Sequence, residues 1–491
     1  MVYDTILVPG YETLRSSTLE RLEAFASAGG KLIFLGHAPK YENAVLSCRG
    51  KKLYQISQQV EFSEDAILSA LEYSRTLDIR QANGQRTDFL LHQLRRDGND
   101  RWLFLAHGVK PTSKDVPEPQ KIRLTMDGCW HITKYDTITG QIAPVNTTIR
   151  DGKTILETVL YDLDSLLLKY SPIPTGTPEE TVQKDYVTIP VPQLVSYQLD
   201  EPNVYLMDKA AFALGNGPYY PETELLRADN ILRDLAGFPS REFSVAQPWT
   251  IPEEQPGHTV ALRFHVHCQE AIPDVKLALE DATLATILFN GTLITAAPDG
   301  WFTDKSIETI PIGTLQQGEN IIEIHLPFGR RTDIEWCYLL GSFGVQVWGE
   351  HRILTAPQPL LGFDDVTKQG LAHYGGNITY QIPIETHRGN IRITVPHYTG
   401  TAVRVELDGQ KGYVAYAPYQ LELDSIAPGS HTLKLTLLGN RFNCFGPVHL
   451  ADPKHRWLGP DCWRTQGSRW TESYRLKPLG IFSAPIIEES I

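Results

Sequence analysis

The chain of 491 residues is acidic, with a formal net charge of −13 and an isoelectric point near 5.6. A chain of this length is too long for a single hydrophobic core, so we expect about three or four domains. Its 42% hydrophobic and 21% charged residues are ordinary for a globular protein. No basic block is available to neutralise phosphates, no apolar run is long enough to span a bilayer, and no signal-peptide pattern opens the chain. We therefore expect a cytoplasmic protein that binds neither nucleic acid nor a membrane.

Residues 1–85 predict an α/β domain. Two apolar strands and two helices are expected, at Tyr3–Pro9, Lys31–Gly36, Leu14–Ala28 and Ser63–Tyr73. A hydroxyl group at residues 16–18 is expected to cap the first helix, and Gly29-Gly30 to end it. A strand, a helix and a second strand in this order predict a parallel βαβ unit.

Residues 86–180 predict a small all-β sandwich. Its strands are expected at Phe89–Arg95, Trp102–His107, Lys121–Met126 and Thr154–Leu160. The stretch Ser171–Glu180 is rich in Pro, Thr and Gly, which is typical of a linker. A separate domain is therefore expected to follow it.

Residues 181–352 and 353–491 share one pattern, which predicts two related antiparallel sandwiches. In the first, Asn290-Gly291 separates two alternating strands, and in the second Asp408-Gly409 does so. Each hairpin is followed by a turn glycine and another alternating strand. Asn-Gly and Asp-Gly are strong hairpin signals because both central residues of such a turn need positive φ. The first sandwich also carries an amphipathic helix, expected at Glu222–Leu235.

This paired pattern resembles the galactose-binding-like jelly rolls of large bacterial glycoside hydrolases with a family 2-like sugar-binding domain. The runs YDTILVPGYETL and LERLEAFASAGGKLIFLG resemble the glutamine-amidotransferase-like, flavodoxin-type domain that follows the catalytic barrel in many of these enzymes. Gly36-His37-Ala38 stands where an amidotransferase needs a nucleophilic Cys, so His37 is interpreted as structural. The resemblance implies a mainly β protein of antiparallel β-sandwiches with an N-terminal flavodoxin-like α/β domain.

The resemblance also implies a C-terminal accessory region of a longer hydrolase, because the sequence lacks the eight βα units of a catalytic barrel. A glycosidase needs two carboxylates beside the scissile bond, one of them with a raised pKa. The acidic candidates are Glu222, Glu224, Asp229, Glu280, Asp304, Glu335, Asp364 and Asp365. None of them follows a strand of a repeated βα pattern, so we expect the catalytic residues outside this chain. The alternative is a glycosidase in its own right that uses acids such as Asp304 and Glu335.

Trp301-x-x-Asp304 and Glu335 form a first candidate sugar-binding cluster. Similar runs, W-x-x-D and I-E-x-x-Y-L-L-G-x-F-G-V, occur in the hydrolase group. Carbohydrate sites combine an aromatic platform with a carboxylate that accepts hydrogen bonds from sugar hydroxyls. The alternative is a structural ion pair of Glu335 with Arg330 or Arg331.

A second candidate cluster lies near the C-terminus. Asn443 and His449 belong to a run similar to the L-x-N-x-x-N-x-x-G-P-x-H signature of the same enzymes, and Trp457 follows it. Amide and imidazole groups supply hydrogen bonds, while the indole supplies a stacking face. A satisfied structural role for His449 is the alternative. Tyr374, in the opening of the second predicted sandwich, is a further candidate for carbohydrate binding.

Neither a metal nor a cofactor is expected. The six cysteines show no Cys-x-x-Cys spacing, which favours free thiols: Cys48, Cys129, Cys268, Cys337, Cys444 and Cys462. His265-x-His267 lacks an evident third ligand, and Asp364-Asp365 fits either a structural calcium or an exposed turn. No nucleotide-binding loop is present.

The favoured hypothesis is a carbohydrate-binding and scaffolding region of a glycoside hydrolase. Its expected partners are a carbohydrate or glycoside ligand and a catalytic barrel segment. A weaker alternative is a homo-oligomerisation module built on the α/β domain.

Overall fold

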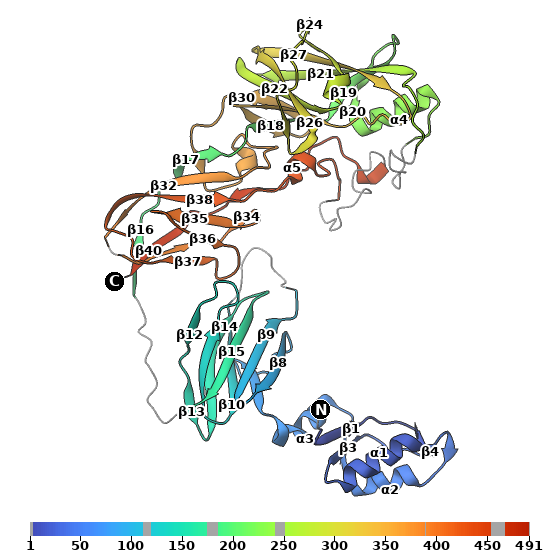
Figure 1. The fold of residues 1–491 in the computed structure, drawn as a ribbon, viewed down its shortest axis with the longest axis vertical. Coiled ribbons are helices and arrows are strands. Elements are labelled where there is room, and N and C mark those ends of the chain that lie inside the picture. The colour runs from blue at the N-terminus through green and yellow to red at the C-terminus, as the bar shows by residue number, and fades with distance from the viewer. Residues whose placement is uncertain are drawn as a thin grey trace. The chain divides into compact units, whose positions relative to one another are not determined.

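The computed structural model describes residues 3–110, 119–173, 185–240, 251–387, 389–452 and 467–490. The chain divides into two units (Figure 1). The first unit comprises residues 1–110 and 119–181, and the second comprises residues 111–118 and 182–491. Most sheets are antiparallel, which confirms the prediction of a mainly β protein.

The first unit begins with a three-stranded parallel sheet in the order β1-β3-β6. Its strands and helices are β1 (Thr5–Val8), β3 (Lys31–Leu35), β6 (Gln58–Val60), α1 (Ser16–Ser27), α2 (Arg49–Ile56) and α3 (Glu64–Ala70). Two-residue strands form a small separate sheet: β2 (Thr13–Leu14), β4 (Tyr41–Glu42) and β5 (Val45–Leu46). The parallel pairing of β1 with β3 confirms the predicted βαβ unit. The flavodoxin-type resemblance stays a prediction.

The predicted side-chain cap at the start of α1 is absent, whereas the predicted glycine beyond its end is present. Its N-cap residue is Arg15, with no side-chain cap, and Ser16 Oγ instead accepts a hydrogen bond from Asn43 Nδ2 at 3.0 Å. The predicted hydroxyl cap is therefore wrong, because a neighbouring loop engages that hydroxyl. Gly29 follows the helix with φ of 88°, as expected of a glycine beyond a helix end.

A small sandwich completes the first unit. One sheet has the order β13-β14-β10-β7 and the other β12-β11-β15-β9-β8. The strands are β7 (Leu77–Gln81), β8 (Leu90–Asp97), β9 (Asp100–His107), β10 (Gln120–Asp127), β11 (Trp130–Tyr135), β12 (Ile142–Pro144), β13 (Thr148–Arg150), β14 (Lys153–Leu160) and β15 (Ser165–Pro172). All four predicted strands are found. Residues 174–180 of the predicted linker lie outside the described residues.

The second unit contains two sandwiches. The first sandwich, residues 203–355, has a five-stranded sheet β18-β28-β22-β26-β25 and a sheet β20-β19-β21-β27-β23-β24 to which β29 and β30 are added. Its elements are β18 (Asn203–Met207), β19 (Lys209–Leu214), β20 (Tyr220–Glu224), α4 (Leu225–Ala236), β21 (His258–Cys268), β22 (Ile272–Glu280), β23 (Thr286–Phe289), β24 (Thr292–Leu293), β25 (Gly300–Phe302), β26 (Asp304–Leu315), β27 (Gly318–Phe328), β28 (Cys337–Gly341), β29 (Gly344–Trp348) and β30 (His351–Thr355). One continuous apolar core fills it.

The second sandwich pairs a sheet β16-β40-β33-β37 with a sheet β31-β17-β32-β38-β35-β36. Its strands are β16 (Tyr186–Ile189), β17 (Leu194–Leu199), β31 (Leu361–Gly362), β32 (Ile378–Thr386), β33 (Ile391–Thr394), β35 (Val403–Leu407), β36 (Gln410–Val414), β37 (Gln420–Leu423), β38 (Gly429–Leu437) and β40 (Ile486–Ser490), with a separate ribbon of β34 (Tyr398–Thr399) and β39 (Gly480–Ile481). It has its own apolar core.

The predicted repeat is confirmed in both sandwiches. Asn290 and Gly291 connect β23 to β24 with φ of 46° and 79°, and β23 pairs with β27. Asp408 and Gly409 connect β35 to β36 with φ of 50° and 81°, and β35 pairs with β38. Each copy is therefore a tight hairpin laid against the long strand that follows it.

The strand pairing does not follow the predicted domain boundaries. Strands β16 and β17, expected in the first sandwich, pair with β40, β31 and β32 of the second. We define the C-terminal segment as the described residues 440–452 and 467–477, which include α5 (Phe442–Phe445). In Figure 1 this segment reaches the first sandwich, and Cys444, Val448 and Tyr474 join its core. The second sandwich thus begins before the first and sends a segment back into it.

Candidate functional site

The first predicted cluster lies at an edge of the five-stranded sheet of the first sandwich. Trp301 is in the edge strand β25, opposite Glu308, and is 56% exposed. Asp304 Oδ1 accepts hydrogen bonds from Ser306 N at 2.9 Å and Ser306 Oγ at 2.8 Å. These two bonds hold the pKa of Asp304 below its usual value. Within the described residues no hydrogen bond engages Asp304 Oδ2, so this atom can accept from a ligand.

A third carboxyl group, Glu280 at the end of β22, accompanies this cluster. Partial burial and the charges of Asp281 and Asp304 raise the pKa of Glu280. Glu335 is exposed, just before β28, and adds with Glu280 to the effect of burial in raising the pKa of Cys337. The charge of Asp304 therefore acts on Glu280, and the charges of Glu280 and Glu335 both act on Cys337.

Arg330 and Arg331, the predicted structural partners of Glu335, form ion pairs with other glutamates. Arg330 forms its ion pair with Glu254 at 3.7 Å, and Arg331 forms one with Glu253 at 2.9 Å. The structural role predicted for Glu335 therefore stays a prediction.

Two other predicted sugar-binding residues lie inside the protein. Tyr374 is fully buried, and its hydroxyl donates to the backbone oxygen of Asn377 at 3.0 Å. Asn443 is buried in α5, donates from Nδ2 to Lys477 O, and accepts at Oδ1 from Lys477 N, both at 2.8 Å. Both side chains satisfy backbone groups, so this structure does not present them to a ligand.

His449 belongs to a buried polar network that joins the C-terminal segment to the first sandwich. Its Nε2 lies 2.7 Å from Asp208 Oδ2, and its Nδ1 lies 2.9 Å from the backbone oxygen of Thr471. Asp208 Oδ1 also accepts from Tyr474 OH at 2.7 Å and from the Arg352 guanidinium. Both ring nitrogens of His449 face oxygen atoms, so the ring connects Asp208 to the backbone of the C-terminal segment.

Asp208 is the centre of this network. Burial alone would raise its pKa, but the Arg352 charge and the hydrogen bond with His449 hold the pKa of Asp208 well below its usual range. His373, buried beside these groups, has its pKa lowered to about 3 by burial and by the Arg352 charge. Asp208, His449 and Tyr474 are at most 8% exposed and the Arg352 side chain is 8% exposed, so the arrangement is a structural clasp. The structural alternative for His449 is the one that the contacts support.

The sequence pattern marks His449 but not the residues that it contacts. The Asp208–His449 contact spans 241 residues, and no local pattern marks Asp208 or Arg352 as a member of the cluster. Glu224 was only one acid among eight candidates. It caps α4, accepting from Arg227 N at 3.1 Å and from Trp336 Nε1 at 2.8 Å, and burial raises the pKa of Glu224 to about 7.

The remaining predictions concern metals, thiols and Trp457. Among the described residues no cluster of three or more potential ligands could hold a metal ion, and no helix is long and apolar enough to cross a membrane. Asp365 Oδ1 accepts from Thr367 N and Leu479 N, so it serves a turn. The five described cysteines are free thiols. Trp457 and Cys462 lie outside the described residues.

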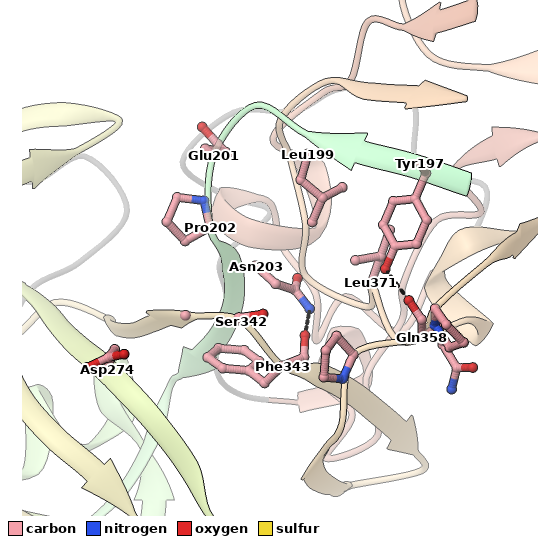
Figure 2. Close-up of a pocket in the computed structure, with 13 residues that line it drawn as sticks. Tyr197, Leu199, Glu201, Pro202, Asn203, Asp274, Ser342, Phe343, Gln358 and Leu371 are labelled. Atoms are coloured by element: carbon pink, nitrogen blue, oxygen red, sulfur yellow. Dashed lines mark hydrogen bonds between the residues drawn. The ribbon is translucent and has the colours of Figure 1, made fainter. Parts of the chain in front are cut away.

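A pocket of about 540 Å³ opens where the two sandwiches join (Figure 2). Its walls come from the passage between β17 and β18, the turn after β28, and the chain that follows β30. The lining residues are Tyr197, Leu199, Glu201, Pro202, Asn203, Asp274, Gly341, Ser342, Phe343, Pro357, Gln358, Pro359 and Leu371. Sequence analysis did not predict this pocket, because its walls come from segments far apart in the chain.

Comparison with known proteins yields structural neighbours only. No protein-family model and no curated protein matches the chain. A rhamnosidase from Novosphingobium sp. PP1Y aligns with a TM-score of 0.48 and 12% identity over 99% of this chain and 34% of that one. An exo-carrageenase from Bacteroides ovatus gives 0.22 and 15% over 35% and 22%, and a β-D-mannosidase from Dictyoglomus thermophilum gives 0.21 and 14% over 48% and 31%. These neighbours are glycoside hydrolases, and the chain spans about a third of the length of the rhamnosidase.

Proposed function

We propose that this chain is a carbohydrate-binding and scaffolding region of a glycoside hydrolase that acts on plant or microbial glycans, with the catalytic barrel supplied from outside these residues. The observation that carries the proposal is the exposed Trp301 ring in the edge strand β25, three residues before the carboxylate of Asp304 at the start of β26. An indole face packs against the C–H face of a pyranose, while a carboxylate oxygen accepts from sugar hydroxyls.

The scaffolding part of the proposal is supported by the way the two sandwiches are joined. Asn203 Nδ2 donates to Phe343 O at 2.7 Å and to Gly370 O at 2.9 Å, which links β18 and the turn after β28 of the first sandwich to the stretch between β31 and β32 of the second. The buried clasp around Asp208 adds a second connection through the C-terminal segment. Two fixed connections hold the sandwiches as one support for a neighbouring domain.

The test is binding to a glycan panel by the purified chain and by Trp301→Ala. Loss of the indole contact area is expected to weaken binding about tenfold. Trp348→Ala is the matched control, because Trp348 is 53% exposed on the first sandwich but lies in β29. The proposal fails if the unmodified chain binds no glycan of the panel, and the Trp301 assignment fails if both variants bind alike.

A second candidate function is glycoside hydrolysis by this chain itself. The opposite pKa shifts of Glu280 and Asp304 favour it, because an acid–base pair needs one protonated and one ionised carboxyl group. Release of nitrophenol from aryl glycosides measures this activity. A rate that falls at least about a hundredfold in Glu280→Gln and Asp304→Asn supports catalysis, with Glu335→Gln testing the residue named from sequence. Absence of turnover in the unmodified chain removes this alternative.

A further inference from the structure

We infer that the pocket between the two sandwiches is a second carbohydrate subsite, one that takes a single neutral sugar unit. This inference rests on the proposed carbohydrate-binding function and deepens it. A volume of about 540 Å³ lies within the usual range for small-molecule sites, which also favour domain junctions. The pocket shares no lining residue with the Trp301 cluster, so the two sites can be tested separately.

The backbone at Asp274 directs a carboxylate to this pocket. Between Ile272 and Val275 the pairing of β22 with β26 is interrupted by a β-bulge, and Asp274 has φ of 55°. A non-glycine residue in the left-handed region costs about 1–3 kcal/mol, and bulges often re-aim a side chain at a site. In the described part of the chain Asp274 has no hydrogen bond or ion pair, so both carboxylate oxygens are available. A carboxylate of this kind accepts two neighbouring hydroxyls of one sugar.

The opposite wall supplies an aromatic ring and uncommitted polar groups. Tyr197 OH donates to the backbone oxygen of Gln358 at 2.9 Å, as Figure 2 shows, which fixes the ring in the wall. The Gln358 amide and the Ser342 hydroxyl are exposed and make no hydrogen bond with any described residue. An aromatic face with amide, hydroxyl and carboxylate groups around it is the chemistry that recognises a polyhydroxylated ring.

The charge of the lining disfavours an anionic ligand. Glu201 is engaged by both terminal nitrogens of Arg441, so its carboxylate is already compensated. Asp274 is then the one uncompensated charge among the lining residues, none of which is Lys, Arg or His. A sugar acid or phosphate would meet this carboxylate without a cation, and a metal ion would find too few ligands. A neutral hydroxylated ring meets neither obstacle.

The floor of the pocket is rigid. The Asn203 side chain is held by Phe343 O and Gly370 O, and Asn203 Oδ1 also accepts from Val204 N at 2.8 Å. Val345 N donates to Gly370 O at 2.8 Å and adds a further connection between the sandwiches. A site whose walls are fixed before binding loses less conformational entropy when a ligand enters.

The experiment measures binding of methyl glycosides of glucose, galactose, mannose and rhamnose by calorimetry, in the full chain and in Trp301→Ala. Asp274→Asn keeps the shape and tolerates the left-handed backbone but removes the charge, and we expect at least about tenfold weaker binding to the pocket. Ser342→Trp fills the pocket from an exposed position and is expected to abolish that binding. Asp151→Asn is the matched control, because Asp151 also has positive φ (51°) but lies in the first unit.

The outcomes separate the subsite from the proposed function. Binding that survives in Trp301→Ala, weakens in Asp274→Asn and is lost in Ser342→Trp supports the subsite, provided that each variant unfolds thermally as its parent does. Binding by the full chain that neither pocket variant changes, or that Trp301→Ala alone abolishes, overturns the subsite and leaves the proposed function standing. A full chain that binds none of these sugars and no glycan of the larger panel overturns both.

Discussion

Replacing Asp208 with Asn should be among the most destabilising single changes in the second unit. Asp208 is 0% exposed and accepts hydrogen bonds from His449, Tyr474 and Arg352. The amide keeps one acceptor oxygen but turns an NH2 group toward one of these donors. It also leaves the buried Arg352 guanidinium without its counter-charge. Breaking one side of a buried ion pair costs about 3–5 kcal/mol, and we expect a loss of this size.

The assay is urea unfolding together with hydrogen exchange resolved along the chain. Two units need not unfold together, so one transition cannot be assumed, and exchange identifies the affected part. Asp208→Asn should speed exchange in the C-terminal segment, whose Tyr474 N donates to Gly349 O, and leave the first unit unchanged. Tyr474→Phe removes one donor and should cost about 1 kcal/mol. Asp234→Asn, at an exposed position of α4, should stay within about 0.5 kcal/mol.

The stability that Asp208 contributes depends on pH. The pKa of Asp208 is depressed in the folded chain, so its contribution is fully present above the unfolded value of about 3.9 and is lost as the pH falls toward the folded value. Asp208→Asn should therefore lower stability more at pH 7 than at pH 3, where part of this contribution is already lost. The reasoning is refuted if Asp208→Asn costs less than about 1 kcal/mol at pH 7, or if the cost does not shrink in acid.

Two further predictions concern stability. The pKa of Glu224 is raised to about 7, so the folded chain holds a proton that the unfolded chain releases near pH 4.3, and stability should fall as the pH rises from about 4.5 to 7. Glu224→Gln should remove this fall when unfolding is measured at pH 5 and pH 8; an unchanged slope would assign the titration elsewhere. Gly409→Ala, at φ of 81°, should cost about 1–2 kcal/mol in thermal unfolding, whereas Gly257→Ala, outside any positive-φ turn, should be nearly neutral. Equal effects of the two alanines would contradict the turn argument.

Local signals predicted the elements of this fold better than their partners. Asn-Gly and Asp-Gly determine φ within two residues, so the hairpins at Asn290 and Asp408 followed directly from the sequence. The helix α4 was expected three residues too early because Glu224, counted as helical, is its N-cap and ends β20. Strand β17 was assigned to the wrong sandwich because its alternation says which face is buried but not against which sheet.

The candidate binding residues also differ in whether local sequence predicts them. Trp301 and Asp304 were predicted from positions only three residues apart, and they lie in the paired strands β25 and β26 at one edge of the sheet. The pocket needs Tyr197, Asp274 and Gln358 from three separate segments, and the bulge that places Asp274 depends on its pairing with β26. Such a site cannot be found before the sheet is known, because no residue in it stands out in its own neighbourhood.

The polar run near the C-terminus shows why a dense set of hydrogen-bonding residues does not by itself indicate a ligand. The C-terminal segment has little regular secondary structure, so many of its backbone groups lack a ladder partner and must be satisfied by side chains. Asn443 hydrogen-bonds the backbone of Lys477. His449 hydrogen-bonds the backbone oxygen of Thr471 and also contacts Asp208. A segment that crosses from one sandwich into the core of another needs such groups at every irregular turn. The same residue types that would bind a sugar are therefore used to bind the protein's own backbone. The exposed carboxylate oxygens without a hydrogen bond to any described residue, Asp304 Oδ2 and both oxygens of Asp274, are the better guides to a ligand.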